Sequence, residues 1–119
     1  MDFNEVVTDI VESVPGGKAA VIMARDGISI ADYVKPGESV DIQTMGIEYT
    51  GILEEIRKAT EVLHAGRLEE LTINSESLLF IVRLITDEYF LALAMAPDGN
   101  YGKGRYLVRL AAPRLVEEF

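Results

Sequence analysis

Residues 68–96, LEELTINSESLLFIVRLITDEYFLALAMA, decide the fold of this chain. In the first segment, 68–74, apolar and polar residues alternate, which is typical of a strand with one solvent-facing side. The second and third segments, 78–85 and 89–96, are apolar at nearly every position, as in strands buried on both faces. Short polar connections separate the segments, so the stretch predicts three consecutive antiparallel strands joined by hairpin turns.

Two more strands are predicted upstream, over residues 18–24 and 28–33. Arg25, Asp26 and Gly27 connect them in a tight turn, because glycine tolerates the positive φ that such turns require. The second of these strands carries polar residues among apolar neighbours, which suits the edge of a sheet.

Three segments have the 3.6-residue apolar periodicity of amphipathic helices. The first begins after Asp2, a favourable N-cap residue. The second is long, because its pattern begins after Ser39 or Asp41 and continues to about Ala65. The third follows residues 97–100 and has an apolar pattern from Val108 to Phe119, with Pro113 inside it.

The predicted element order is α-β-β-α-β-β-β-α, within a single domain over residues 1–119. Because short turns join the consecutive strands, we expect an α+β fold, a five-stranded antiparallel sheet with helices on both faces. The two alternating strands, which begin at Ile28 and Leu68, belong at the edges of the sheet. The strands expected in the centre begin at Lys18, Ser77 and Tyr89.

The long helix carries an apolar seam along its whole length. The seam residues recur at alternating steps of four and three, which places them on one face. Other apolar residues lie off this face, at Ile42, Ile47, Leu53 and Val62, so the helix has more than one side to bury. We interpret the seam as part core and part contact with a second copy; a simple core role is the alternative. The seam residues are Met45, Tyr49, Ile52, Ile56, Ala59 and Leu63.

The composition narrows the classes of partner. The chain has 119 residues, of which 49% are hydrophobic, enough for one globular core. Asp and Glu number 20 against 11 Lys and Arg, and a net charge of −9 repels nucleic acid and anionic membranes. No cysteine is present, the N-terminal segment is acidic, and no apolar run approaches the roughly 18 residues that span a bilayer. We therefore expect a cytoplasmic protein that does not insert into membranes.

No residue pattern in the chain points to catalysis. The single histidine, His64, stands near the end of the long helix without suitably spaced carboxylates. Residues 99–105, GNYGKGR, precede a helix, but they lack the glycine spacing of a P-loop and its Ser or Thr after Lys. The adjacent carboxylates at 54–55, 69–70 and 117–118 diverge on a helix or strand. We expect a protein that is not an enzyme and that has no metal site or cofactor.

The element order resembles the roadblock/LC7 family over essentially the whole chain, and two local motifs support the resemblance. Residues 24–31, ARDGISIA, are similar to the first hairpin of that family. Residues 100–118, with GKGR at 102–105 and RLAAP at 109–113, are similar to the closing helix of its bacterial members. The resemblance implies a homodimer in which strand 68–74 pairs with its copy and the two long helices lie side by side.

By position, the resemblance assigns the dimer contact to the seam of the long helix and to the middle of the edge strand. The residues it assigns are Met45, Tyr49, Ile52, Ile56, Ala59, Leu63, Leu71, Thr72 and Ile73.

The resemblance also implies a function. It implies a non-catalytic regulator or scaffold that binds a Ras-like small GTPase and stimulates or modulates its nucleotide cycle by remodelling the switch regions. One alternative is a structural adaptor subunit of a larger assembly with no effect on nucleotide turnover. Another is a small-molecule sensor of PAS or GAF type, which would need several convergent polar groups beneath the sheet. Apart from a few hydroxyls, only Arg83 offers such a group in the strand cores, which disfavours the sensor.

Overall fold

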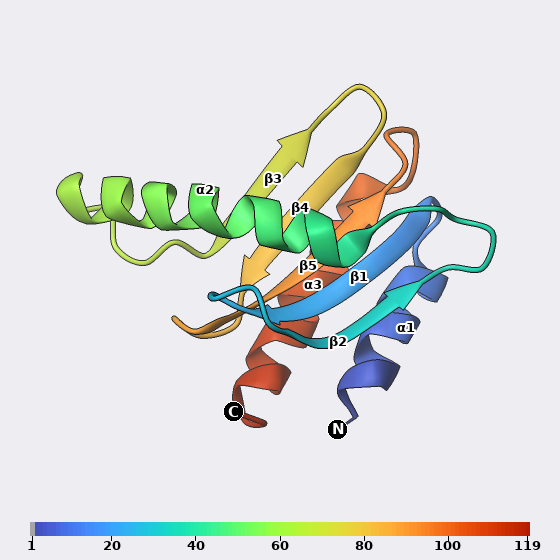
Figure 1. The fold of residues 1–119 in the computed structure, drawn as a ribbon, viewed down its shortest axis with the longest axis horizontal. Helices are drawn as coiled ribbons and strands as arrows, with labels where there is room; N and C mark the ends of the chain where they lie inside the picture. Colours follow the sequence, from blue (N-terminus) through green and yellow to red (C-terminus); the bar gives the residue numbers. More distant parts are fainter. Residues whose placement is uncertain (1) are drawn as a thin grey trace.

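A computed structural model describes residues 2–119 as a five-stranded sheet with one helix on one face and two helices on the other (Figure 1). The element order α-β-β-α-β-β-β-α and the α+β class are those predicted. The helices are α1 (Phe3–Ser13), α2 (Ile42–Val62) and α3 (Tyr101–Val116), and the strands are β1 (Gly17–Ala24), β2 (Ser29–Val34), β3 (Glu70–Asn74), β4 (Leu79–Leu84) and β5 (Tyr89–Met95).

The strands lie in the order β2-β1-β5-β4-β3, and every neighbouring pair is antiparallel. The three central strands are the ones whose side chains are apolar on both faces, and nearly all of their residues are buried. The two alternating strands, β2 and β3, form the edges, as predicted. The turn between β1 and β2 depends on Gly27, whose φ is 92°.

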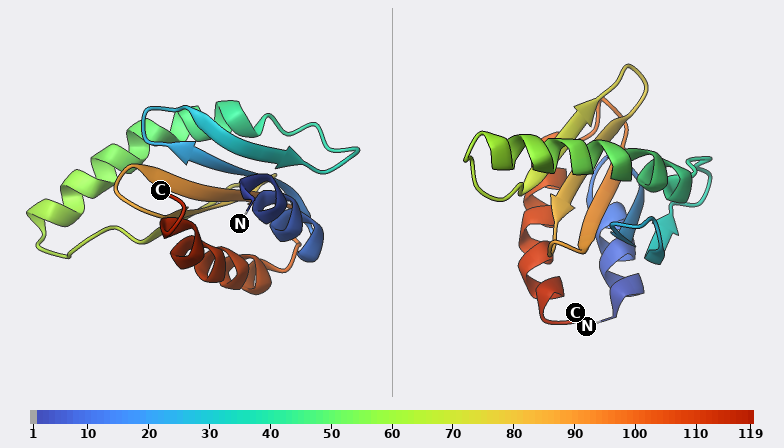
Figure 2. Two further views of the ribbon diagram at one scale, coloured as in Figure 1. Left: turned by 90° about the horizontal axis from the view of Figure 1, so that it is seen from below. Right: turned by 60° about the vertical axis from the view of Figure 1, so that its left-hand side comes forward.

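The two faces of the sheet are covered differently. Figure 2 shows α1 and α3 side by side beneath one face, while α2 crosses the opposite face. Under α1 and α3 lies the larger core, which includes Val11, Leu91 and Leu115. The core on the α2 face includes Phe80 and Phe90, and half-buried side chains lie at its margin.

The ends of α2 follow from two local features. Asp41 is the N-cap: its Oδ1 accepts a hydrogen bond of 3.1 Å from the backbone N–H of Thr44. This hydrogen bond, with a second one from the Thr44 hydroxyl, lowers the pKa of the Asp41 carboxyl. At the other end His64 adopts a left-handed φ of 54°, and Ala65 N–H donates to the Thr60 carbonyl. The helix therefore ends at Val62, before the predicted end at about Ala65.

The edge strand β3 is shorter than the predicted 68–74. It begins at Glu70, because the chain first has to return from the far end of α2 to the sheet. The ladder is nevertheless extended by one bond, in which Leu84 N–H donates to the Glu69 carbonyl at 2.9 Å. Leu68 is half-buried against the α2-side core. The predicted strand begins too early because Leu68 is apolar and packs against the core, although it lies before the strand.

Candidate protein-interaction surfaces

Helix α2 is anchored to the sheet by three fully buried residues, Ile42, Gly46 and Leu53. A Cβ at position 46 would lie 2.7 Å from Sδ of Met23, so the absence of a side chain lets the helix approach β1 closely. Ile42 and Leu53 lie off the predicted seam, yet they are the apolar side chains of α2 that the monomer buries most fully. The sheet-facing side of α2 is therefore rotated away from the seam.

The six seam residues divide into two groups. Met45 and Tyr49 are half-buried against the sheet, and the ring of Tyr49 stacks on Phe80 with centroids 5.0 Å apart. Ile56 is also half-buried, whereas Ala59 is exposed. The remaining two seam residues, Ile52 and Leu63, are 46% and 73% exposed. The seam thus has both a core side and a solvent side within one chain.

Strand β3 presents its apolar side chains to the same face as α2. Leu71 and Ile73 are half-buried against the α2-side core. Thr72 points to the opposite face, where its hydroxyl lies 3.1 Å from the hydroxyl of Tyr101 on α3. Within residues 2–119, β4 is the only strand paired with β3, so the outer edge of β3 keeps unpaired backbone donors and acceptors.

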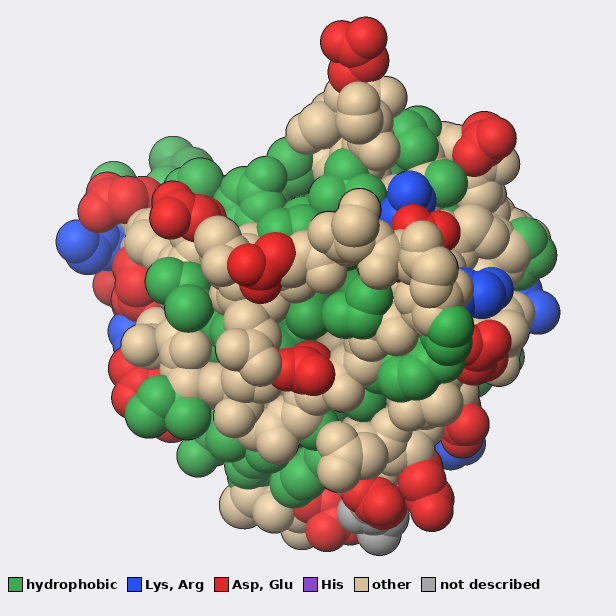
Figure 3. Space-filling view, turned by 45° about the vertical axis from the view of Figure 1, so that its right-hand side comes forward, with side chains coloured by type: hydrophobic (Ala, Val, Ile, Leu, Met, Phe, Trp, Pro, Cys, Tyr) green, Lys and Arg blue, Asp and Glu red, His purple; other side chains and the backbone are tan. Residues whose placement is uncertain are grey.

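We call the exposed apolar side of α2 and the open edge of β3 the α2–β3 surface; its members are Met45, Tyr49, Ile52, Ile56, Ala59, Leu63, Leu71 and Ile73. In the space-filling view, hydrophobic side chains gather along the upper side of the molecule, in the hollow beside its projecting tip (Figure 3). An apolar helix face beside an unpaired strand edge can bind another chain by sheet extension and helix contact together.

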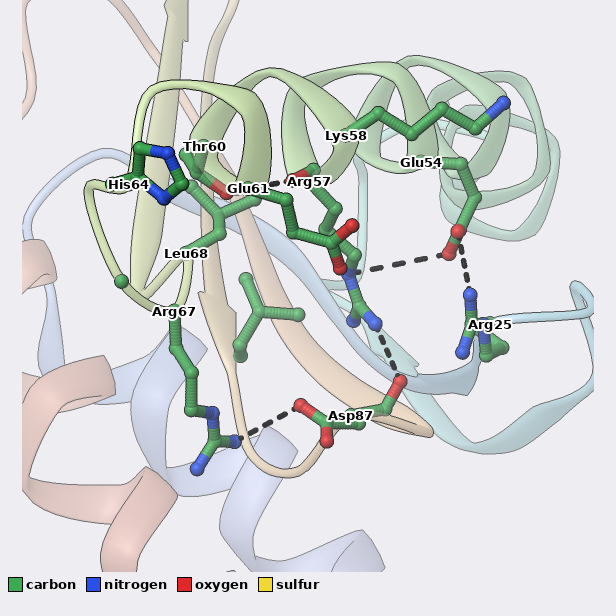
Figure 4. Close-up of a pocket in the computed structure, with 12 residues that line it drawn as sticks. Arg25, Glu54, Arg57, Lys58, Thr60, Glu61, His64, Arg67, Leu68 and Asp87 are labelled. Carbon is green, nitrogen blue, oxygen red and sulfur yellow. Dashed lines mark hydrogen bonds and ion pairs between the residues drawn. The ribbon is translucent and has the colours of Figure 1, made fainter.

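A second feature lies where the C-terminal half of α2 extends past the sheet. A hollow of about 680 Å³ opens there, which we call the overhang hollow (Figure 4). Four Lys and Arg residues and three Asp and Glu residues line it, so it is slightly basic on an otherwise acidic protein. Its lining residues are Arg25, Glu54, Arg57, Lys58, Thr60, Glu61, His64, Gly66, Arg67, Leu68, Leu84 and Asp87.

Ion pairs in the overhang hollow connect α2 to the sheet. Arg25 Nη2 donates to Glu54 Oε2 at 2.5 Å, and this hydrogen bond raises the pKa of the Arg25 guanidinium. Arg57 Nη1 donates to the backbone carbonyl of Asp87 at 2.6 Å, and Arg67 pairs with the Asp87 carboxylate (Figure 4). The buried Oε1 of Glu54 lies 4.0 Å from Arg57 Nε and has no hydrogen bond within residues 2–119. These contacts link α2 to the β1–β2 and β4–β5 turns.

The other residues considered for chemistry have structural surroundings. Asn100 caps α3 by accepting a hydrogen bond from Lys103 N–H, and the buried Gly104 packs beside Met95, so residues 99–105 form the start of a helix. Among residues 2–119, no group of three or more His, Asp or Glu is placed to hold a metal ion. No helix in that range has an apolar stretch long enough to cross a bilayer.

The adjacent carboxylates do not all diverge as predicted: Glu69 and Glu70 both pair with Arg83, at 3.7 and 3.5 Å, whereas the pair at 54–55 does diverge. Glu54 pairs with Arg25, and its neighbour Glu55 pairs with Lys58. Glu70 Oε2 accepts a 2.6 Å hydrogen bond from Arg105, which raises the pKa of that guanidinium. The overhang hollow, in contrast, has no signal in the sequence, because its residues come from separate segments.

Comparisons with known proteins extend this description. A scan against protein-family models and a search of curated proteins find no match. The crystal structure of MglC from Myxococcus xanthus is 38% identical over 100% of both chains, with a TM-score of 0.71. A roadblock/LC7 domain from Streptomyces avermitilis is 18% identical, covering 99% of this chain and 98% of that one, with a TM-score of 0.85. The gliding protein MglB from Thermus thermophilus is 17% identical, covering 96% and 88%, with a TM-score of 0.81.

The fold and these surfaces define a small α+β domain with an open-edged sheet and an incompletely covered helix. The chain belongs to the roadblock/LC7 family, since the match to MglC extends over its whole length.

Proposed function

We propose that this protein is a homodimeric, non-catalytic adaptor or regulator that binds other proteins, with a Ras-like small GTPase as its partner. The observation that carries the dimer is the α2–β3 surface, where an apolar helix face lies beside an unpaired strand edge. The GTPase follows from the resemblance to the roadblock/LC7 family, to which the chain belongs. The neighbours named as Mgl proteins, one of them a gliding protein, support a regulatory or adaptor role.

A second copy is the partner that the α2–β3 surface suits best. A two-fold axis beside β3 would pair this edge with its copy, so that each strand supplies the donors and acceptors that the other lacks. Leu71 and Ile73 would then form a continuous apolar row with their copies. The overhanging half of α2, with Ile52 and Leu63 exposed, would cover the partner's sheet. This arrangement would pair the open strand edge and would also bury the exposed residues of the seam.

The effect on the GTPase is proposed to come from remodelling rather than from a catalytic residue. Two of the arginines that contact α2 or lie on it, Arg25 and Arg57, are held in ion pairs on this chain. An arginine finger must reach the transferred phosphate, and its removal typically costs 10³-fold or more in rate. A docking surface distributes its effect over many contacts instead.

The test measures GTP hydrolysis by a cognate GTPase in the presence of this protein and of single arginine-to-alanine variants. The arginines to replace are Arg25, Arg57, Arg67, Arg83, Arg105, Arg109 and Arg114. We expect each exposed position to change the stimulated rate by roughly tenfold or less, because rim charges mainly affect docking. A variant that abolishes stimulation while the complex still forms would contradict remodelling. Binding with unchanged turnover would indicate the structural adaptor instead.

A further inference from the structure

The side of the molecule opposite the α2–β3 surface carries a separate groove. Helices α1 and α3 lie side by side there, and the groove between them has a volume of about 250 Å³ (Figures 1 and 2). Its floor is apolar and is formed by Val6 and Ile10 from α1 and by Leu107, Leu110 and Ala111 from α3. Leu110 remains 41% exposed, so the groove leaves apolar surface in solvent.

The two walls of this α1–α3 groove have opposite charge. Helix α1 contains acidic residues and no basic ones, and Glu5 and Asp9 line the groove. Helix α3 contains Lys103, Arg105, Arg109 and Arg114 and no acidic residue, and Arg114 lines the groove. The acidic and basic walls form no ion pair with each other within residues 2–119.

The basic residues of α3 differ from those elsewhere in the chain. Seven of the 11 Lys and Arg residues form ion pairs within residues 2–119, which leaves four without one. Three of those four, Lys103, Arg109 and Arg114, lie on α3. Of these three, only Arg114 lines the groove, so it is the basic group that the groove leaves available to a partner.

We infer that the α1–α3 groove is a docking site for an amphipathic helix of another protein, one with a Lys/Arg flank, an apolar stripe and an Asp/Glu flank. The apolar stripe would lie on Leu107 and Leu110, the basic flank against Glu5 and Asp9, and the acidic flank against Arg114. This site does not depend on the proposed dimer, because it lies on the opposite face of the sheet from the α2–β3 surface.

A helix fits this groove better than an extended segment does. The walls are helices, whose central backbone groups are already paired internally, so they offer few donors or acceptors to an extended peptide. A helix satisfies its own backbone and packs its side chains between the ridges of α1 and α3.

A second copy of this chain fits less well than a foreign helix. A helix in the groove contacts both walls, so an inserted α3 would meet the basic α3 as well as the acidic α1. An inserted α1 would likewise meet the acidic α1 as well as the basic α3, and each case leaves one like-charge contact. A copy that faced this groove with its own groove would bring two concave surfaces together and leave the apolar floors unfilled. The charge pattern therefore selects a partner whose two flanks differ.

Three synthetic helical peptides of about 16 residues, the length of helix that would span α3, test the site. All share one leucine stripe; their flanks are Lys and Glu, Lys and Lys, or Glu and Glu. Fluorescence anisotropy of labelled peptides measures binding to the wild type and to an Ile52→Asp variant, which places a charge on the α2–β3 surface and is expected to be monomeric. We expect the Lys/Glu peptide to bind at least roughly fivefold more tightly than either control, because only it pairs with both walls. The same preference in both proteins would show that peptide binding does not require the dimer.

Two variants make the result decisive. Glu5→Lys with Asp9→Lys makes both walls basic, so the preference should move to the Glu/Glu peptide. Leu110→Asp should weaken binding by about tenfold or more, since it charges the apolar floor. Ile47→Asp is the matched control, because Ile47 is similarly exposed, at 51%, but lies on α2. Equal binding of the three peptides, or a preference unchanged by the wall reversal, would overturn the inference.

Discussion

The two faces of the sheet differ in how completely their helices cover them. On one face, α1 and α3 lie side by side and enclose a core in which Val108 and Leu115 are inaccessible to solvent. On the other, α2 is alone, its C-terminal half extends past the sheet, and the margin residues Leu71 and Ile73 stay half-buried. The first face encloses the larger core and leaves only the α1–α3 groove open, whereas the second leaves the α2–β3 surface for a further chain to cover.

The comparison shows that hydrophobicity alone does not identify an interface. The central strands are apolar on both faces, yet the seam of α2, with Ile52 and Leu63 exposed, lies over one face only. An incomplete cover over an apolar face is therefore the feature that indicates assembly. Changes at matched positions on the two faces should consequently alter different properties.

The largest expected effect is on folding and lies under α3. Leu115→Ala should lower the free energy of unfolding by about 2–5 kcal/mol, because the side chain is 0% exposed and its removal leaves a cavity. Leu110→Ala on the same helix should cost less than about 1 kcal/mol, since that residue is partly exposed. Urea unfolding monitored by circular dichroism measures both. Equal losses at the two positions would contradict the packing described for α3.

The next effect is on association and lies on the α2–β3 surface. Ile52→Asp should convert the proposed dimer into a folded monomer at micromolar concentration, because a dimer would bury an unpaired carboxylate. Ile47→Asp is the control, as it is similarly exposed on another side of the same helix. Light scattering should give twice the 13.1 kDa chain mass for the wild type and the control, and the single mass for Ile52→Asp. Loss of the dimer in the control would place the contact elsewhere.

A third expectation concerns nucleotide. Neither GTP nor GDP, with or without magnesium, should bind this protein, because residues 99–105 form a capped helix start rather than a phosphate loop. Isothermal titration with both nucleotides checks this. Binding at low-micromolar affinity would require another interpretation of the segment.

The smallest effect is expected at the far end of α2. His64 has a φ of 54°, a conformation that glycine adopts without the steric cost of a Cβ. His64→Gly should therefore raise the free energy of unfolding by about 1 kcal/mol or less. Ala65→Gly, at the next position, should give no such gain. Thermal unfolding of both variants decides between a local backbone effect and a general effect of glycine.

The fold could be predicted from sequence because each element carries its own signal. The alternating and doubly apolar strands identify edge and centre, and short turns fix the antiparallel order. The turn at Gly27 was also predicted, and the cap of α2 was narrowed to Ser39 or Asp41, of which the structure has Asp41, since both features depend on local chemistry.

The orientation of α2 and the overhang hollow could not be predicted in the same way. Periodicity identifies apolar stripes on a helix, but α2 has several, and the stripe that faces the sheet is centred on Gly46. A glycine contributes no hydrophobicity to the pattern, although it permits the close approach to Met23. The hollow joins Arg25, Glu54 and Asp87 from separate segments, so only the tertiary structure brings them together.

A spin-label distance tests the proposed dimer most directly, because the chain contains no cysteine and single labels can be placed without background. Labels at Asn74→Cys on β3 and, in a separate sample, at Ile30→Cys on β2 report on the two sheet edges. Pairing of β3 with its copy gives a ten-stranded sheet, with the two β3 labels within about 20 Å and the two β2 labels about 40 Å apart. That pair of distances is the expected result. A short distance between β2 labels, or no dipolar coupling between β3 labels, would contradict dimerisation through the α2–β3 surface.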